Sequence, residues 1–297
     1  MKKILISCAF ILALISCNKN INPDMPKCSE PGLISFGISE LTATKAVNES
    51  TAATISASGF NVAAITGNAT YFNELATKSG YSYMTANKYY YPQNSSVDFY
   101  ACHPVNRNLS ISGNVVSISY TQNNSEDLIV AKKTAVSSQN GDVQLVFDHV
   151  LAQLAFTAKG SDANVDYILK SISVKAPNGG TYKFADGKWT IGDIATVNYF
   201  NKNLTVSSSS ATNVDEVMTF LPGDIQITVS WECRMDGQLI GQYTKSTLPC
   251  GDPDAIKIEM GKKNTINLVL PNQDASDILF SVQVNPWGSS TQDVVLN

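Results

Sequence analysis

One stretch of the chain alternates strictly between apolar and polar residues, and it limits the fold more than any other feature. Apolar side chains occupy every second position, at Ile225, Ile227, Val229, Trp231 and Cys233. Polar side chains fill the positions between them, at Gln226, Thr228, Ser230 and Glu232. A period of two residues places these sets on opposite faces of a β-strand, so the stretch predicts a half-buried antiparallel strand. Asp236-Gly237 follows as a two-residue turn into residues 239–244, which predicts a β-hairpin.

The same short strands recur along most of the chain. The predicted strands include residues 34–38, 60–64, 172–176, 182–184, 256–260, 265–270 and 278–284. Asn, Gly and Pro turns separate them, a pattern typical of β-sandwiches. Only residues 70–78 look mildly helical. The sequence therefore predicts an all-β protein, and its 297 residues favour two domains.

The alternation changes phase between residues 143 and 158. Val143, Leu145 and Phe147 are apolar at odd positions, whereas Leu154, Phe156 and Ala158 stand at even positions. One strand cannot keep both sets on one face, so we expect a bulge or sharp bend near residues 148–150. We place the domain boundary just before this segment. The predicted domains are an N-terminal β-sandwich at 33–141 and a C-terminal β-sandwich at 142–297.

The start of the chain predicts lipidation. Lys2 and Lys3 precede an apolar stretch, which ends in Ser16-Cys17 as a lipobox does. The stretch falls well short of the roughly 20 residues that a membrane-spanning helix needs. We therefore expect residues 1–16 to be a lipoprotein signal peptide and Cys17 to carry a covalent lipid.

Residues 17–32 predict a lipidated tether, because prolines and a glycine stand among polar residues. Asn18 stands where aspartate would signal retention in the inner membrane. We therefore expect a protein anchored to the outer membrane and exposed at the cell surface.

The sequence carries no pattern for catalysis, metal binding or nucleic-acid binding. Its two histidines, His103 and His149, have no second His or Cys at metal-ligand spacing. It contains no GxSxG turn, HExxH helix or phosphate-binding loop. Without Lys2 and Lys3, 19 basic and 25 acidic residues leave a net charge of −6, which argues against a nucleic-acid partner. We expect no enzyme, no metal site and no cofactor other than the lipid.

Four cysteines besides Cys8 and Cys17 leave the disulfide pattern open. Cys28, Cys102, Cys233 and Cys250 could pair in three ways or remain as buried thiols. In the predicted hairpin, Cys233 lies opposite Ile240 and not opposite Cys250. A Cys233–Cys250 bond would therefore require a second reversal of the chain.

Several motifs follow one another along the chain. The first is Tyr89-Tyr90-Tyr91-Pro92, followed by residues 97–104, VDFYACHP. The second is residues 127–131, DLIVA, followed by residues 145–156, LVFDHVLAQLAF. In this order the motifs resemble those of the fimbrillin-like proteins, which form type V pili, and residues 187–189, 220–222 and 284–287 also fall where that family has recurrent motifs. With the lipobox, the resemblance spans nearly the whole chain.

The resemblance implies two tandem Greek-key, transthyretin-like β-sandwiches, export as a lipoprotein and assembly into a fimbria. In that family an arginine-specific protease removes the first strand, here residues 33–41, and another subunit donates a strand into the groove. The matching cleavage site is Lys45-Ala46, with lysine replacing arginine. Three alternatives follow: a protease that accepts lysine, an uncut anchor subunit, or a surface lipoprotein that does not polymerise. Cys102 replaces a usual aromatic residue, so we expect it to be buried and inert.

Two functions are consistent with these patterns. The first is a structural or adhesive fimbrial subunit whose partners are other subunits joined by strand exchange. The second is a monomeric outer-membrane lipoprotein that binds a glycan or a host protein. The end of the chain, with Val294, Val295 and Leu296, predicts a strand that is either donated to a neighbour or closes its own sheet.

Overall fold

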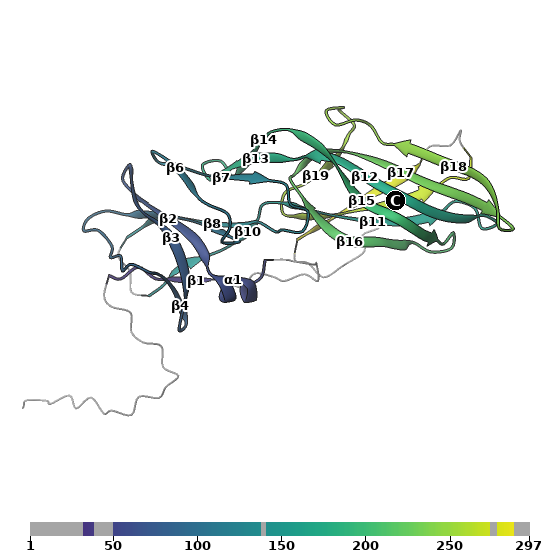
Figure 1. Cartoon of the computed structure of the whole chain (residues 1–297). Coiled ribbons are helices and arrows are strands. Elements are labelled where there is room, and N and C mark those ends of the chain that lie inside the picture. Colours follow the sequence, from purple (N-terminus) through teal and green to yellow (C-terminus); the bar gives the residue numbers. More distant parts are fainter. Residues whose placement is uncertain (1–31, 39–49, 138–140, 274–277, 288–297) are drawn as a thin grey trace, which may run out of the picture.

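The computed structural model describes residues 32–38, 50–137, 141–273 and 278–287, and this part of the chain is almost entirely β-structure (Figure 1). Helix α1 (Ala52–Ser58) is the one α-helix among the described residues. The prediction of an all-β protein is confirmed.

An eight-stranded sheet forms the first part of the molecule. Its strand order is β10-β8-β5-β2-β3-β4-β1-β9. The bounds are β1 (Phe36–Ile38), β2 (Phe60–Thr66), β3 (Ala69–Ser79), β4 (Ser82–Thr85), β5 (Val97–His103), β8 (Ile129–Val136), β9 (Val143–Leu145) and β10 (Asp148–His149). The two end strands, β9 and β10, are consecutive in the chain and separated by two residues. The sheet therefore curls around its own apolar core, in which Phe36, Phe60, Phe99 and Phe147 are buried.

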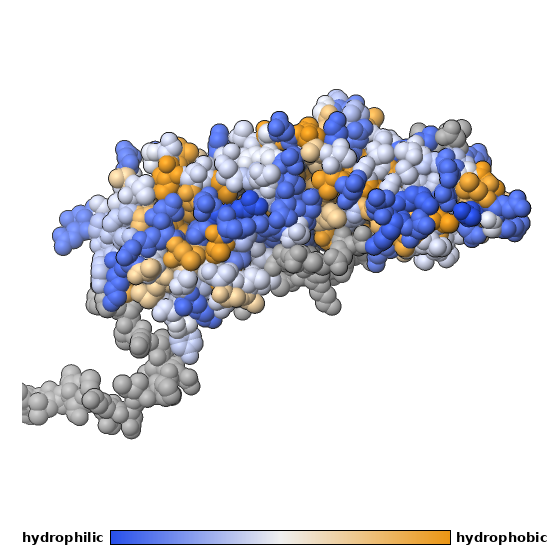
Figure 2. Space-filling view, in the orientation of Figure 1, coloured by the Kyte–Doolittle hydropathy of each residue, from blue (hydrophilic) through white to orange (hydrophobic). Residues whose placement is uncertain are grey.

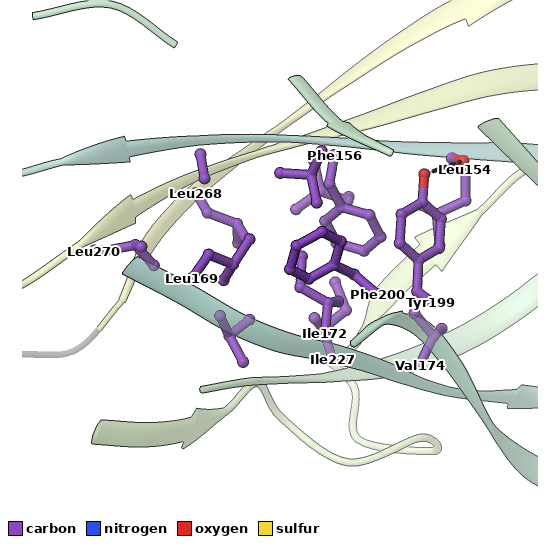
Figure 3. Packing of buried hydrophobic residues seen from close by; sticks show 14 of the residues in the cluster. Leu154, Phe156, Leu169, Ile172, Val174, Tyr199, Phe200, Ile227, Leu268 and Leu270 are labelled. Atoms are coloured by element: carbon purple, nitrogen blue, oxygen red, sulfur yellow. Dashed lines mark hydrogen bonds between the residues drawn. The ribbon is translucent and has the colours of Figure 1, made fainter. Parts of the chain in front are cut away.

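Two further sheets form a sandwich in the second part. One has the order β16-β11-β20-β21 and the other β15-β12-β17-β18, with β19 paired to β17. The bounds are β11 (Ala152–Gly160), β12 (Asp166–Pro177), β15 (Ile194–Val206), β16 (Thr212–Phe220), β17 (Gly223–Met235), β18 (Gln238–Ser246), β19 (Ile256–Ile258), β20 (Lys262–Leu270) and β21 (Leu279–Pro286). Phe156 and Leu268 from the first sheet meet Ile172 and Ile227 from the second (Figure 3).

A fourth sheet joins residues from both sides of Gly141. Its order is β14-β13-β7-β6, with bounds β6 (Ser110–Ser112), β7 (Val115–Thr121), β13 (Gly179–Lys183) and β14 (Lys188–Ile191). β7 and β13 pair antiparallel, and a third core lies here, with Ile118 from the first part and Tyr182 from the second. The division into domains 33–141 and 142–297 stays a prediction, and this sheet shows that the two parts share structure.

The predicted strands are confirmed, and the hairpin differs from its prediction in one detail. Met235 pairs with Gln238 and Arg234 with Leu239 around the Asp236-Gly237 turn, where both residues have positive φ. A register shift between Cys233 and Arg234 then places Cys233 opposite Gly241 rather than Ile240. The alternation predicts β17 but not the bulge. The extra residue, Ile240, lies in β18, so it leaves the alternation of β17 unchanged.

Residues 70–78 are not helical as predicted, because they lie in β3. Phe72 and Ala76 are buried four residues apart, a spacing that also occurs on one face of a helix. Pairing with β2 on one side and β4 on the other determines the strand. The actual helix, α1, has only Ile55 buried and begins at a Thr51–Thr54 capping box.

The phase change near residue 148 is a bend at which the chain passes between sheets. Val143, Leu145 and Phe147 belong to the core of the eight-stranded sheet. Leu154 and Phe156 belong to the core of the sandwich. The predicted bend is confirmed, because each apolar set faces a different core.

Candidate functional site

Strand β1 lies inside the eight-stranded sheet, between β4 and β9. Phe36 pairs with Tyr83 of β4 in the antiparallel direction and with Val143 of β9 in the parallel direction. The chain just before β1 is also bonded, because Ile34 N donates to Tyr89 O at 2.8 Å and Val143 N donates to Ser35 O at 2.8 Å. The first strand that the sequence predicted is therefore an interior strand, hydrogen-bonded on both sides.

The side chains of this segment fill the core. Leu33, Ile34 and Phe36 are buried, and Phe36 is fully buried. The Phe36 ring makes edge contacts with Phe60 and Phe99, with ring centroids 5.9 and 5.4 Å apart. Removing the segment would leave an apolar groove edged by unpaired backbone groups, the combination that accepts an added strand.

Asp142 holds the two neighbours of β1 together. Ser35 Oγ donates to Asp142 Oδ1 at 2.5 Å, and Ser82 Oγ donates to Asp142 Oδ2 at 2.7 Å. A Cβ on Gly37 would lie 2.4 Å from Gln144 Nε2, so a larger residue at position 37 would require the Gln144 side chain to move. The two hydrogen bonds of Asp142 link the segments of β1, β4 and β9 at this point.

The three tyrosines of the first motif cover the sheet beside β1. Tyr89 stacks on Phe72 at 4.3 Å and donates a hydrogen bond to Glu74 Oε1 at 2.6 Å, which lowers the pKa of the Glu74 carboxyl. Tyr91 is buried, and burial raises its pKa to about 12. Only Tyr90 is exposed, and it pairs with Leu33. Tyr89 and Tyr91 therefore act as packing residues of this sheet.

His149 contacts a carboxylate and an indole through its ring. Its Nδ1 lies 3.0 Å from Asp127 Oδ2, and its ring stacks on Trp287 with centroids 4.3 Å apart. Gln153 lies in β11 and is buried. Its backbone oxygen accepts a bond from Asn264 Nδ2 at 3.1 Å, whereas its side-chain Oε1 has no hydrogen-bond partner among the described residues.

His103 lines a polar pocket of about 480 Å³ that also contains Ser50, Glu126 and Asp127. Its Nδ1 lies 2.9 Å from Gly59 O, and burial lowers the pKa of the ring. Within the described ranges, no group of three or more His, Cys, Asp and Glu side chains could hold a metal ion.

Three cysteines are described, and all are free thiols. Cys102 and Cys233 are buried, and burial raises the pKa of both thiols, that of Cys102 to about 12. Cys250 is partly exposed, and its thiol lies 3.5 Å from Lys175 O. A Cys233–Cys250 bond is therefore not formed, and Cys102 is buried, as the resemblance implied.

Iodoacetamide at pH 8 is expected to modify Cys250 in the folded protein and to leave Cys102 and Cys233 unmodified. The thiolate is the reactive form, and it is scarce in a buried thiol with a raised pKa. Peptide mass spectrometry measures the labelled fraction at each cysteine, and labelling in urea provides the control in which all should react. Equal labelling rates at Cys102 and Cys250 in the folded protein would contradict the assignment.

The other predicted site residues lie outside the described residues. They are Cys17, Cys28, Lys45, Ala46, Val294, Val295 and Leu296. Within the described part of the chain, no helix has the length and apolar character needed to cross a membrane.

Comparisons with known proteins give one family match and several solved structures of similar fold. A family model described as fimbrillin-like matches residues 36–287. A fimbrial protein of Bacteroides vulgatus has a TM-score of 0.66 at 18% identity, over 86% of this chain and 99% of its own. A protein of Bacteroides eggerthii, assigned provisionally to cell adhesion, has a TM-score of 0.51 at 12% identity, over 87% of this chain and 96% of its own. These likenesses show the fold alone. No curated protein matches the sequence.

Proposed function

Because the chain belongs to the fimbrillin-like family, we propose that it is a structural or adhesive subunit of a type V pilus that assembles by β-strand donation. The observation that carries this proposal is the interior position of β1, between β4 and β9. The described residues of this strand connect to α1 only through residues 39–49, so one cut in that segment would separate β1 from the rest of the chain. The groove left behind would offer backbone groups and apolar contacts to a strand from another copy.

Processing would occur at Lys45-Ala46, within that connecting segment. Lysine in place of arginine requires a protease that accepts lysine. Without such a protease the chain would stay uncut, and an uncut subunit fits an anchor, whose own β1 fills the groove. Export as a lipoprotein, with the lipid on Cys17, would place either form at the outer-membrane surface.

The end of the chain supplies the candidate donor or closing strand, Val294 to Leu296. β21 is an edge strand of its sheet, and its exposed residues include Leu279, with 69% of its surface accessible. A cavity of about 280 Å³ lies beside it, lined by residues of β17 and by Thr247, Leu248, Ile278 and Phe280. An open edge beside an apolar cavity supports the role of a strand that closes its own sheet.

The test of this proposal uses a variant that can be cut. Lys45→Arg followed by an arginine-specific protease is expected to yield chains that form fibres, because the groove is emptied. Electron microscopy and size-exclusion chromatography measure the product, and uncut Lys45→Arg protein is the control that should stay monomeric. A cut chain that has lost β1 and remains monomeric at high concentration would contradict strand donation.

Deleting residues 291–297 separates the two roles of the tail. If the tail is a donor, cut chains without it should remain unjoined. If it closes its own sheet, the deletion should lower the melting temperature of the uncut monomer, because pairing at an edge is lost. A truncated protein that melts normally and still forms fibres would contradict both roles.

The second candidate function is a monomeric surface lipoprotein that binds a glycan or a host protein. The hairpin tip between β17 and β18 favours it, because Met235, Leu239 and Ile240 are exposed there. Figure 2 shows an apolar patch at this end of the molecule. A chain that keeps β1, stays monomeric and is attached to no fibre on the cell surface would support this function over the first.

A further inference from the structure

Asp127 connects three segments that lie far apart in the sequence. Its side chain is buried, and its Oδ2 accepts a hydrogen bond from Ser50 N at 2.8 Å. Its backbone oxygen accepts a second bond, from Ser50 Oγ at 3.0 Å. Ser50 is the first described residue after segment 39–49, and it stands four residues after Ala46. One aspartate therefore holds the chain where it re-enters the fold after the proposed cleavage site.

The same carboxylate orients His149. His149 Nδ1 lies 3.2 Å from Asp127 Oδ1 and 3.0 Å from Oδ2. A carboxylate only accepts hydrogen bonds, so Nδ1 carries the proton and donates it. The His149 ring also stacks on the indole of Trp287, at a centroid distance of 4.3 Å and an interplanar angle of 9°. The orientation of the imidazole therefore determines the surface against which the indole packs.

Trp287 is held at the root of the tail by its backbone as well. Trp287 N donates to Gly261 O at 3.0 Å, and Gly261 N donates to Leu151 O at 2.8 Å. Leu151 follows His149 by two residues, so the ring contact and the backbone contact both lead to the bend between β10 and β11. Trp287 is the last described residue before residues 288–297. Trp287, the residue that precedes the tail, therefore lies close to His149 and to the bend that follows it.

We propose that the path Ser50–Asp127–His149–Trp287 couples the segment before α1 to the root of the tail, so that loosening Ser50 loosens Trp287. Ser50 and Asp127 both line the pocket of about 480 Å³. If Ser50 withdraws, water from this pocket reaches the carboxylate and competes with His149 for it. A hydrogen bond weakens when its surroundings become more polar, so the imidazole loses its fixed orientation and Trp287 its packing surface.

The inference rests on the proposed function for its biological meaning. A cut after Lys45 would place Ser50 four residues from a new chain end, and residues near an end open most readily. The loss of β1 would then loosen Trp287, the residue that precedes the candidate donor or closing strand. The physical coupling can be measured in an uncut chain, whether or not fibres form.

The experiment measures amide hydrogen exchange at Trp287 by NMR in the uncut mature chain. Ser50→Pro removes both donors to Asp127, the amide N–H and the hydroxyl, and we expect it to speed exchange at Trp287 by about tenfold, within the usual range of coupling between sites. In a His149→Phe background, which keeps an aromatic ring but lacks the bond to Asp127, the same substitution should change the exchange rate less than twofold. His103→Phe is the matched control, because His103 lines the same pocket and bonds to Gly59 instead.

Two results would overturn the inference. One is an unchanged Trp287 exchange rate in Ser50→Pro while the chain stays folded. The other is an equal increase in the presence and absence of His149. If Ser50→Pro does not fold, Lys45→Arg protein cut by the protease replaces it, with uncut protein as its control. Fibre formation without this coupling would refute the inference alone, and coupling without fibres would refute only the proposed function.

Discussion

Replacing Phe36 with alanine is expected to lower the free energy of unfolding by about 3–5 kcal/mol, the usual cost of deleting a buried phenylalanine ring. The ring is fully buried and contacts Phe60 and Phe99. Neighbours from several strands surround it, so they cannot all move into the cavity. Denaturation in urea, followed by circular dichroism, gives the free energy if unfolding is two-state and otherwise the shift in the first transition.

Tyr81→Ala provides the matched control for Phe36→Ala. Tyr81 is an aromatic residue in the turn between β3 and β4, and 70% of its surface is exposed. Its replacement should change stability by less than about 0.5 kcal/mol, as surface substitutions usually do. A loss below about 1 kcal/mol for Phe36→Ala would contradict the structural role assigned to β1.

Cys17→Ala is expected to abolish membrane attachment. We propose that the thiol of Cys17 receives diacylglycerol, and each buried CH₂ of an acyl chain contributes about 0.8 kcal/mol to anchoring. The variant should accumulate as unacylated precursor and enter the aqueous phase in detergent partitioning. Labelling with a radioactive fatty acid provides a second measurement.

Cys28→Ala is the control for Cys17→Ala. Both cysteines precede β1, but Cys28 lies 11 residues beyond the lipobox. Its replacement should leave acylation and partitioning unchanged. Equal partitioning of Cys17→Ala and the natural protein would refute the lipoprotein assignment.

Much of the fold could be predicted because a strand that packs one face against a core needs apolar residues on that face alone. The alternation from Ile225 to Cys233 identifies β17, and the phase change after Phe147 identifies the passage between two cores. The bulge beside Cys233 could not be predicted in this way, because its effect lies in the pairing with β18. The helical spacing of Phe72 and Ala76 in β3 was misleading for a related reason, since pairing partners decided the structure.

The candidate site could be predicted only where local sequence defines it. The motif of Tyr89 to Tyr91 and the first strand were found from the sequence, but the position of β1 between β4 and β9 was not. No local pattern links Phe36 to Val143 or Ser50 to Asp127. The bond of His149 to Asp127 was missed for the same reason, since the two side chains come from segments 22 residues apart.

The interior position of β1 also affects the order in which the protein can fold. Ser35 and Asp142, which bond across the β1–β9 pair, are separated by 107 residues. β1 is made early during synthesis, yet its parallel neighbour β9 emerges only after all the other strands of the sheet except β10. Such a distant pairing carries a large entropic cost of loop closure and forms slowly. While the chain is being synthesised, the first strand must therefore remain unpaired on its β9 side until β9 has been made.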